Sequence, residues 1–86
     1  MYSIVYTKRA KSDIVKVKEA GLDKKAKSLI DLLRENPFVS PPTFEKLKGE
    51  LSGAYSRRES IKHRFVYQVD DKEKIVKIII MLAHYK

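Results

Sequence analysis

The sequence contains no cysteine, and it holds only three glycines and three prolines among 86 residues. Without cysteine the chain can form neither a disulfide nor a thiolate metal site. No apolar run approaches the roughly 18 residues that a membrane-spanning helix needs. Positive residues follow the first apolar stretch instead of preceding it, which is not the pattern of a signal peptide. These absences lead us to expect a soluble cytoplasmic protein that does not engage a membrane.

Positive charge, in contrast, is abundant. Nineteen Lys and Arg residues against eleven Asp and Glu residues give a net charge of +8. Such a surplus suits a polyanion such as RNA, or an acidic protein partner. A lysine-rich solvated surface would give the same composition, so charge alone does not distinguish the two. The 43% of hydrophobic residues suffices for one small core, and we expect a single domain over residues 1–86.

Hydrophobic periodicity predicts one strand and two helices in the first part of the chain. Residues 2–6 are aromatic and β-branched, as is typical of a strand. Apolar residues at helical spacing predict a helix over 8–20, with Thr7 as its N-cap and Gly21 at its C-terminal end. A second helix is predicted to begin near Asp23, another residue suited to capping, and to end before the first proline. The two helices would form an antiparallel hairpin that covers a sheet.

The rest of the chain changes to a period of two residues. Residues 36–53 hold all three prolines and are predicted to be a long connection. Strands are predicted at 54–60, 63–69 and 74–85, with a turn at 70–73. The predicted order is therefore β-α-α-β-β-β. We expect an α+β fold in which a mostly antiparallel four-stranded sheet carries the N-terminal helical hairpin on one face.

Few side chains of this sequence could carry chemistry, and no nucleotide-binding loop, metal-ligand spacing or nucleophile triad is present. Counting back from the predicted turn places residues 78–82 opposite 62–65, with His84 and Tyr85 just beyond. These two residues would then approach Arg64 at one edge of the sheet, although a slip of one residue would exchange the faces. The other histidine, His63, neighbours Arg64 and is expected to point to the opposite face, so we interpret it as structural.

A basic groove with Arg, His, Tyr and Glu suits the metal-free cleavage of RNA. A base must take the proton of the ribose 2′-hydroxyl and an acid must protonate the leaving oxygen, and each contributes about 10²–10⁴-fold. Cationic donors must also stabilise the charge that develops on the phosphate. From the residues alone, however, His84 is more typical of a structural histidine and Tyr85 of a terminal aromatic. Glu45 is likewise indistinguishable from any loop glutamate.

The stretch FEKLKGELSGAYSRRESIKHRFVYQV, residues 44–69, together with the terminal His-Tyr pair resembles the YoeB family of bacterial toxins, part of the RelE superfamily. The similarity covers essentially the whole chain in element order and length. It implies a microbial-RNase-like fold and an mRNA endonuclease that acts on the ribosome without a metal or cofactor. It also implies a cognate antitoxin, whose acidic disordered segment would fold onto this protein and cover or disturb the site.

The resemblance assigns roles to individual residues. It implies that Glu45 is the general base, that Arg64 stabilises the transition-state phosphate, and that His84 is the general acid with Tyr85 beside it. Lys86 departs from the family pattern because it follows the pair that usually closes the chain. Contacts to RNA phosphates are expected of three further basic residues: Lys48, Arg57 and Arg58.

Two other functions are compatible with this sequence. A ParE-like toxin that inhibits gyrase would share the fold class, but the set of Glu45, Arg64 and His84 argues against it. A non-catalytic basic module would bind nucleic acid without any need for a terminal His-Tyr pair. A homodimer is as compatible with the sequence as an assembly with the antitoxin.

Overall fold

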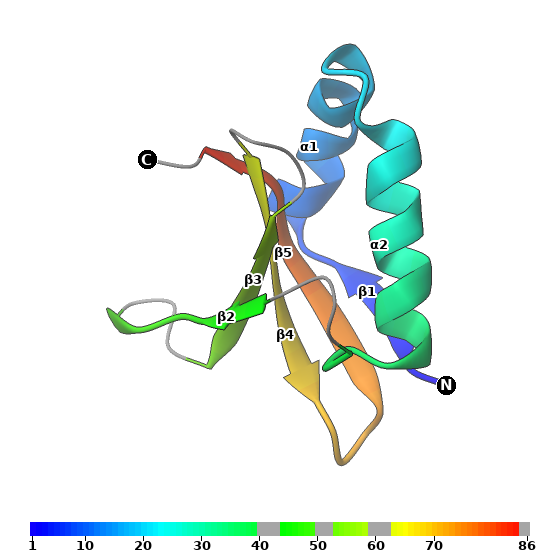
Figure 1. The fold of residues 1–86 in the computed structure, drawn as a ribbon, viewed down its shortest axis with the longest axis vertical. Helices are drawn as coiled ribbons and strands as arrows, with labels where there is room; N and C mark the ends of the chain where they lie inside the picture. The colour runs from blue at the N-terminus through cyan, green and yellow to red at the C-terminus, as the bar shows by residue number, and fades with distance from the viewer. Residues whose placement is uncertain (40–43, 50–52, 59–62, 85–86) are drawn as a thin grey trace.

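The computed structural model describes residues 1–39, 44–49, 53–58 and 63–84, which form a five-stranded sheet with two helices on one of its faces (Figure 1). The strand order is β1-β5-β4-β3-β2; β1 runs parallel to β5 and the other neighbours are antiparallel. The predicted α+β class and helical hairpin are therefore confirmed. The elements in chain order are β1 (Ser3–Tyr6), α1 (Lys8–Glu19), α2 (Asp23–Glu35), β2 (Phe44–Lys46), β3 (Ala54–Arg58), β4 (His63–Asp70) and β5 (Ile75–His84).

The sheet has five strands where four were predicted. The additional strand is β2, which lies within the segment expected to be a connection and pairs antiparallel with β3. Three residues carry too little alternation for a period of two to be recognised, so the pairing partner decides their conformation. The other predicted strands are found as β1, β3, β4 and β5. Residues 59–60 and 85, at the predicted ends of two strands, lie outside the described residues.

Local signals set the helix ends, with one exception. The Thr7 hydroxyl accepts the Ala10 N–H at 3.1 Å, which confirms the predicted N-cap of α1. Gly21 follows this helix with a φ of +73°, in the left-handed region that favours glycine. At α2 the cap position belongs to Leu22, while Asp23 lies in the first turn, so the predicted cap is one residue too late. Neither helix has the length and apolar character of a membrane-spanning helix.

The hydrophobic core lies between the helices and the sheet. Each helix presents one apolar stripe, and alternate side chains of β4 and β5 point toward it. In Figure 1 both helices lie on the same side of the sheet, and no described helix covers its other face, which we call the open face. The buried core residues are Ala10, Val17, Ala26, Leu29, Leu33, Phe65, Tyr67, Val76, Ile78 and Met81.

Arg57 belongs to this interior. Its side chain is 0% exposed, and its guanidinium donates to the Tyr67 hydroxyl and to the Pro37 carbonyl, both at 3.0 Å. The guanidinium also lies 4.9 Å from the centre of the Phe44 ring. The Tyr67 hydroxyl donates to the same Pro37 carbonyl at 3.1 Å, and burial raises the pKa of this tyrosine. One buried cation thus connects β2, β3, β4 and the segment that follows α2.

A second polar cluster joins the β4–β5 turn to the N-terminus. The Tyr2 hydroxyl donates to the Asp71 carboxylate, and the Lys74 ammonium lies 3.1 Å from the same carboxylate. These bonds lower the pKa of Asp71 and raise the pKa of both partners. The cluster fixes the end of the β4–β5 hairpin that is remote from residue 84.

We expect Arg57→Met to lower the free energy of unfolding by about 2–3 kcal/mol, because it removes the charged donor from two buried acceptors. Urea denaturation followed by circular dichroism measures this loss. Arg58→Met is the matched control, since the neighbouring side chain is exposed; it should change the free energy by no more than about 0.5 kcal/mol. Equal losses in both variants would contradict the structural role of Arg57.

Candidate active site

Glu45 of β2 and Arg64 of β4 meet on the open face of the sheet. Arg64 alternates with the fully buried Phe65 and therefore points away from the helices. Its Nη1 lies 3.3 Å from Oε2 of Glu45. The glutamate side chain is 62% exposed and the arginine side chain 25%, so solvent reaches the pair. A carboxylate and a guanidinium are thus held together where a large ligand could approach both.

Arg58 is the third predicted site residue on this face. It pairs with Arg64 across β3 and β4, and directly opposed residues of an antiparallel pair share a face. Adjacent residues of one strand point to opposite faces, so Arg57 and Arg58 cannot both face the Glu45–Arg64 pair. Arg57 was predicted to bind phosphate, but its side chain is buried and bonded to Tyr67 and Pro37, so its role is structural.

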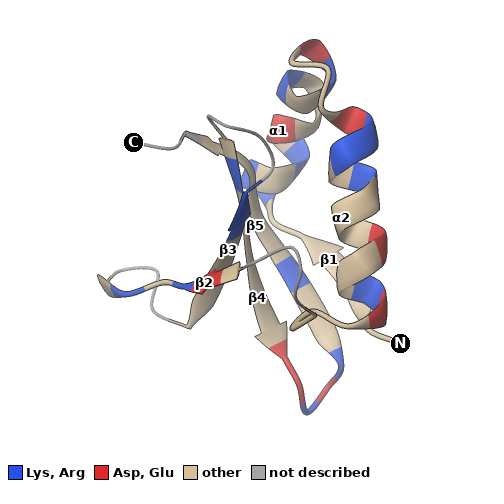
Figure 2. Cartoon of the chain, in the orientation of Figure 1, with Lys and Arg blue, Asp and Glu red and all other residues tan. Residues whose placement is uncertain are grey.

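Lys48 follows β2 and has an exposed side chain. Figure 2 shows basic residues along both helices as well as on β2 and β3. The net charge of +8 is therefore distributed over the molecule and is not confined to the open face. Among the described residues, no group of His, Asp and Glu side chains is placed to hold a metal ion.

The backbone of β5 brings residue 84 to the same end of the sheet. Ala83 pairs with Arg64, and His84 pairs with His63. The predicted approach of the last strand to Arg64 is found, but the predicted register of 78–82 opposite 62–65 is wrong. In the observed ladder Ala83, and not His84, occupies the position that shares a face with Arg64. Tyr85 lies outside the described residues.

The register differs because β5 contains two more residues than the part of β4 it faces. A β-bulge adds one residue to a strand, bends it and increases its twist. Without the two irregularities, regular counting would place residue 84 opposite residue 61, about 7 Å farther along β4 than its observed partner. The bulges thus bring the end of β5 back to Arg64. The register changes over three successive pairs: Tyr67 with Ile78, Val66 with Ile80, and Arg64 with Ala83.

Two side chains from the beginning of the chain bond to the backbone of this irregular segment. The Thr7 hydroxyl donates to the Ile79 carbonyl at 2.8 Å. The Asp13 carboxylate accepts the Met81 N–H at 3.2 Å, and its other oxygen faces Nε of Arg9 at 3.4 Å. Buried backbone groups outside a regular ladder need such partners. Sequence reasoning did not find these roles, although an acidic residue at the helical spacing of buried residues was a signal.

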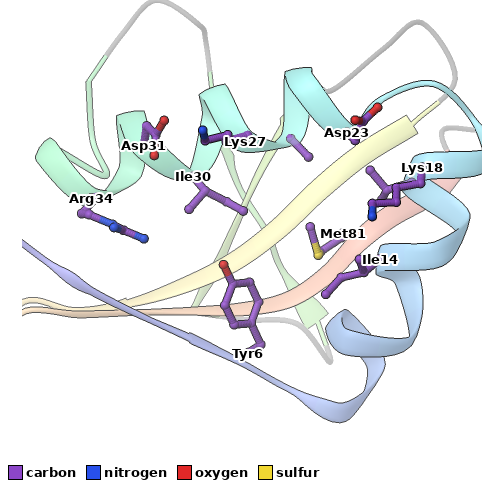
Figure 3. Close-up of a pocket in the computed structure, with 11 residues that line it drawn as sticks. Tyr6, Ile14, Lys18, Asp23, Lys27, Ile30, Asp31, Arg34 and Met81 are labelled. Atoms are coloured by element: carbon purple, nitrogen blue, oxygen red, sulfur yellow. The ribbon is translucent and has the colours of Figure 1, made fainter.

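A hollow of about 360 Å³ lies on the helix side of the sheet (Figure 3). Tyr6, Ile30 and Met81 contribute apolar surface to it. The Glu45–Arg64 pair does not line it, so this hollow is separate from the candidate active site. Charged side chains from both helices also line it: Lys18, Asp23, Lys27, Asp31 and Arg34.

Comparison with known proteins identifies the family to which this chain belongs. Residues 6–85 match the family of YoeB-like toxins of bacterial type II toxin–antitoxin systems. The chain belongs to this family. Toxin YoeB of Streptomyces coelicolor is 33% identical over 75 residues, which cover 85% of this chain and 89% of that protein. Toxin YoeB of Escherichia coli is 42% identical over 53 residues, which cover 62% of this chain. The chain spans 63% of the length of the Escherichia coli relative and 53% of that from Mycobacterium bovis.

Solved structures of related toxins share the fold. The YoeB/ParE toxin from Agrobacterium tumefaciens superposes with a TM-score of 0.84 at 30% identity, covering 96% of this chain and 99% of that chain. The YoeB–YefM toxin–antitoxin complex from Staphylococcus aureus contains a chain with a TM-score of 0.80 at 32% identity, with 99% of both chains covered. A structure of a YoeB dimer from the same organism matches with a TM-score of 0.78, at 31% identity and with 98% of both chains covered. The predicted RelE-type α+β fold is therefore confirmed.

We expect Glu45→Gln to change the free energy of unfolding by less than about 1 kcal/mol, because solvent-exposed ion pairs contribute little to stability. Thermal and urea denaturation of the purified variant measure the change. A loss as large as that expected for Arg57→Met would show instead that the Glu45–Arg64 pair holds β2 on the sheet.

Proposed function

We propose that this member of the YoeB family is the toxin of a type II toxin–antitoxin pair and cleaves mRNA on the ribosome. The observation that carries the proposal is the Glu45–Arg64 pair on the open face, next to the strand that ends in His84. A carboxylate can accept a proton, and a guanidinium can bind a phosphate through two parallel hydrogen bonds. Both are needed for cleavage of RNA by its own 2′-hydroxyl.

In the proposed reaction Glu45 takes the proton of the ribose 2′-hydroxyl as that oxygen attacks the adjacent phosphorus. The bond between phosphorus and the 5′-oxygen breaks, and His84 gives its proton to the departing oxygen. The products are a 2′,3′-cyclic phosphate and a free 5′-hydroxyl. Arg64 stabilises the charge on the non-bridging oxygens, and Tyr85 helps to shape the site. The 3.3 Å contact between Glu45 and Arg64 implies that the incoming phosphate competes with the carboxylate for the guanidinium.

Two exposed basic residues, Lys48 and Arg58, are proposed to hold neighbouring RNA phosphates. Contacts of this kind fix the position of a strand without reading its sequence. The attacking group belongs to the RNA itself, so the proposed chemistry uses no metal or cofactor.

The proposed setting is the bacterial cytoplasm, where ribosomes and mRNA are available. The related Staphylococcus aureus structures are a YoeB–YefM heterotetramer and a YoeB dimer. We propose that the present chain likewise has a cognate antitoxin that inhibits it, and that it forms a homodimer when no antitoxin is bound. The net charge of +8 suits an acidic antitoxin segment.

Induction of the wild type in bacteria should produce new mRNA 5′ ends within translated codons during growth arrest. His84→Ala should reduce these cuts by about 100-fold or more, because it removes the proposed acid. Sequencing of mRNA 5′ ends measures the cuts, and immunoblotting confirms equal amounts of protein. His63→Ala is the matched control: it removes the histidine of the paired strand and should retain most cleavage. Arrest that persists in His84→Ala without cuts would instead favour a gyrase inhibitor or a non-catalytic module.

Arg58→Ala should weaken binding to RNA by a similar factor for every sequence tested. Each lost phosphate contact to a single strand lowers the slope of log affinity against log salt by about 0.7. Titrations of fluorescent RNA at several salt concentrations, with Glu45→Gln as background to prevent cleavage, measure both effects. A loss restricted to one RNA sequence would contradict a phosphate contact.

A further inference from the structure

Asp13 is a buried acidic residue that the proposed reaction does not use. Its side chain is 1% exposed and lies on the buried side of α1, between Ala10 and Val17. Burying a carboxylate is costly unless polar partners compensate for the lost water. An apolar side chain at this position would avoid that cost, and replacing buried charges with apolar residues is often neutral or stabilising. The contacts of Asp13 therefore suggest a role other than stability.

The two carboxylate oxygens of Asp13 have different partners. One lies 3.4 Å from Nε of Arg9, whose side chain is 58% exposed, so that ion pair contributes little. The other accepts the Met81 N–H at 3.2 Å, a buried bond between residues 68 positions apart in the sequence. Met81 lies between the Val66–Ile80 and Arg64–Ala83 pairs, where β5 gains its second extra residue. The carboxylate thus binds the backbone at the irregularity itself.

This position connects α1 to the far end of the sheet. Met81 and His84 are three positions apart, and residues 82–84 are the last described residues of β5. Loss of the extra residue would shift β5 against β4 by one position and would move residue 84 about 3.3 Å farther along β4, away from Arg64. The pairing of Ala83 with Arg64 would then be lost.

We propose that Asp13 is a positioning residue for the catalytic end of β5. By accepting the Met81 N–H it holds the second bulge in place, and so keeps Ala83 opposite Arg64 and His84 opposite His63. The effect on cleavage rests on the proposed function of Arg64 and His84, whereas the effect on strand register does not.

The test compares Asp13→Leu with Asp13→Asn in the full chain. Leucine keeps a similar volume but offers no acceptor, whereas asparagine keeps an oxygen that can accept the Met81 N–H. Glu19→Gln is the matched control, because Glu19 is an exposed acid at the end of the same helix. NMR measures amide hydrogen exchange at Met81 and the cross-strand contacts between residues 64 and 83, and sequencing of mRNA ends measures cleavage in cells.

Asp13→Leu should remain folded, exchange the Met81 amide about tenfold faster, lose the contacts between residues 64 and 83, and cleave about 100-fold less. Asp13→Asn should restore the register and most of the cleavage, and Glu19→Gln should match the wild type. Wild-type register in Asp13→Leu would overturn the proposal. If Asp13→Leu loses the register and the wild type itself never cleaves mRNA, the positioning role is supported and the proposed function is refuted.

If Asp13→Leu does not fold, Asp13→Ser takes its place, because its shorter side chain withdraws the acceptor from Met81. The wild type supplies an independent measurement in that case. A Met81 amide that exchanges as fast as an unprotected amide would show that the bond to Asp13 does not hold the strand, and would overturn the proposal.

Discussion

The pairing register of β5 with β4 is the constraint on which the candidate site depends. The two strands are not in simple register: β5 takes up two extra residues before it reaches Arg64. Such a course leaves backbone groups that the ladder cannot pair. Thr7 and Asp13 supply partners for two of them, at the Ile79 carbonyl and the Met81 N–H. The beginning of the chain thus stabilises the geometry of its end.

Because side chains alternate along a strand, one face of the sheet is buried against the helices and the other is exposed to solvent. In the doublet Arg57-Arg58 the first side chain is fully buried beneath Phe44 and beside Tyr67, while the second is exposed on the open face. Their charge is the same, yet one joins strands in the interior and the other is available to a polyanion. A basic residue on a strand can therefore be interpreted only once its face is known. Composition alone cannot separate structural from functional charge.

The family shares its fold with toxins of other names, and a fold does not determine a function. A mutant of YafQ from Escherichia coli superposes with a TM-score of 0.81 at only 20% identity, which shows a common architecture and no more. The proposed RNA cleavage depends instead on particular atoms. The Glu45 carboxylate and the Arg64 guanidinium meet on a solvent-accessible face, and their weak mutual attraction leaves both able to exchange partners with a substrate.

The sequence by itself determined the elements whose signals are local: both helices, the Thr7 cap, the strands of the β4–β5 hairpin and the α+β class. Hydrophobic periodicity and capping act over a few residues, so they can be recognised in the sequence. Tertiary structure alone decided the existence of β2, the register of β5, the burial of Arg57 and the bond from Asp13 to Met81. Each depends on partners that are distant in the chain, and no local pattern specifies such partners. For the same reason, the resemblance suggested Glu45 and Arg64 as site residues, whereas their 3.3 Å contact emerged only from the paired strands.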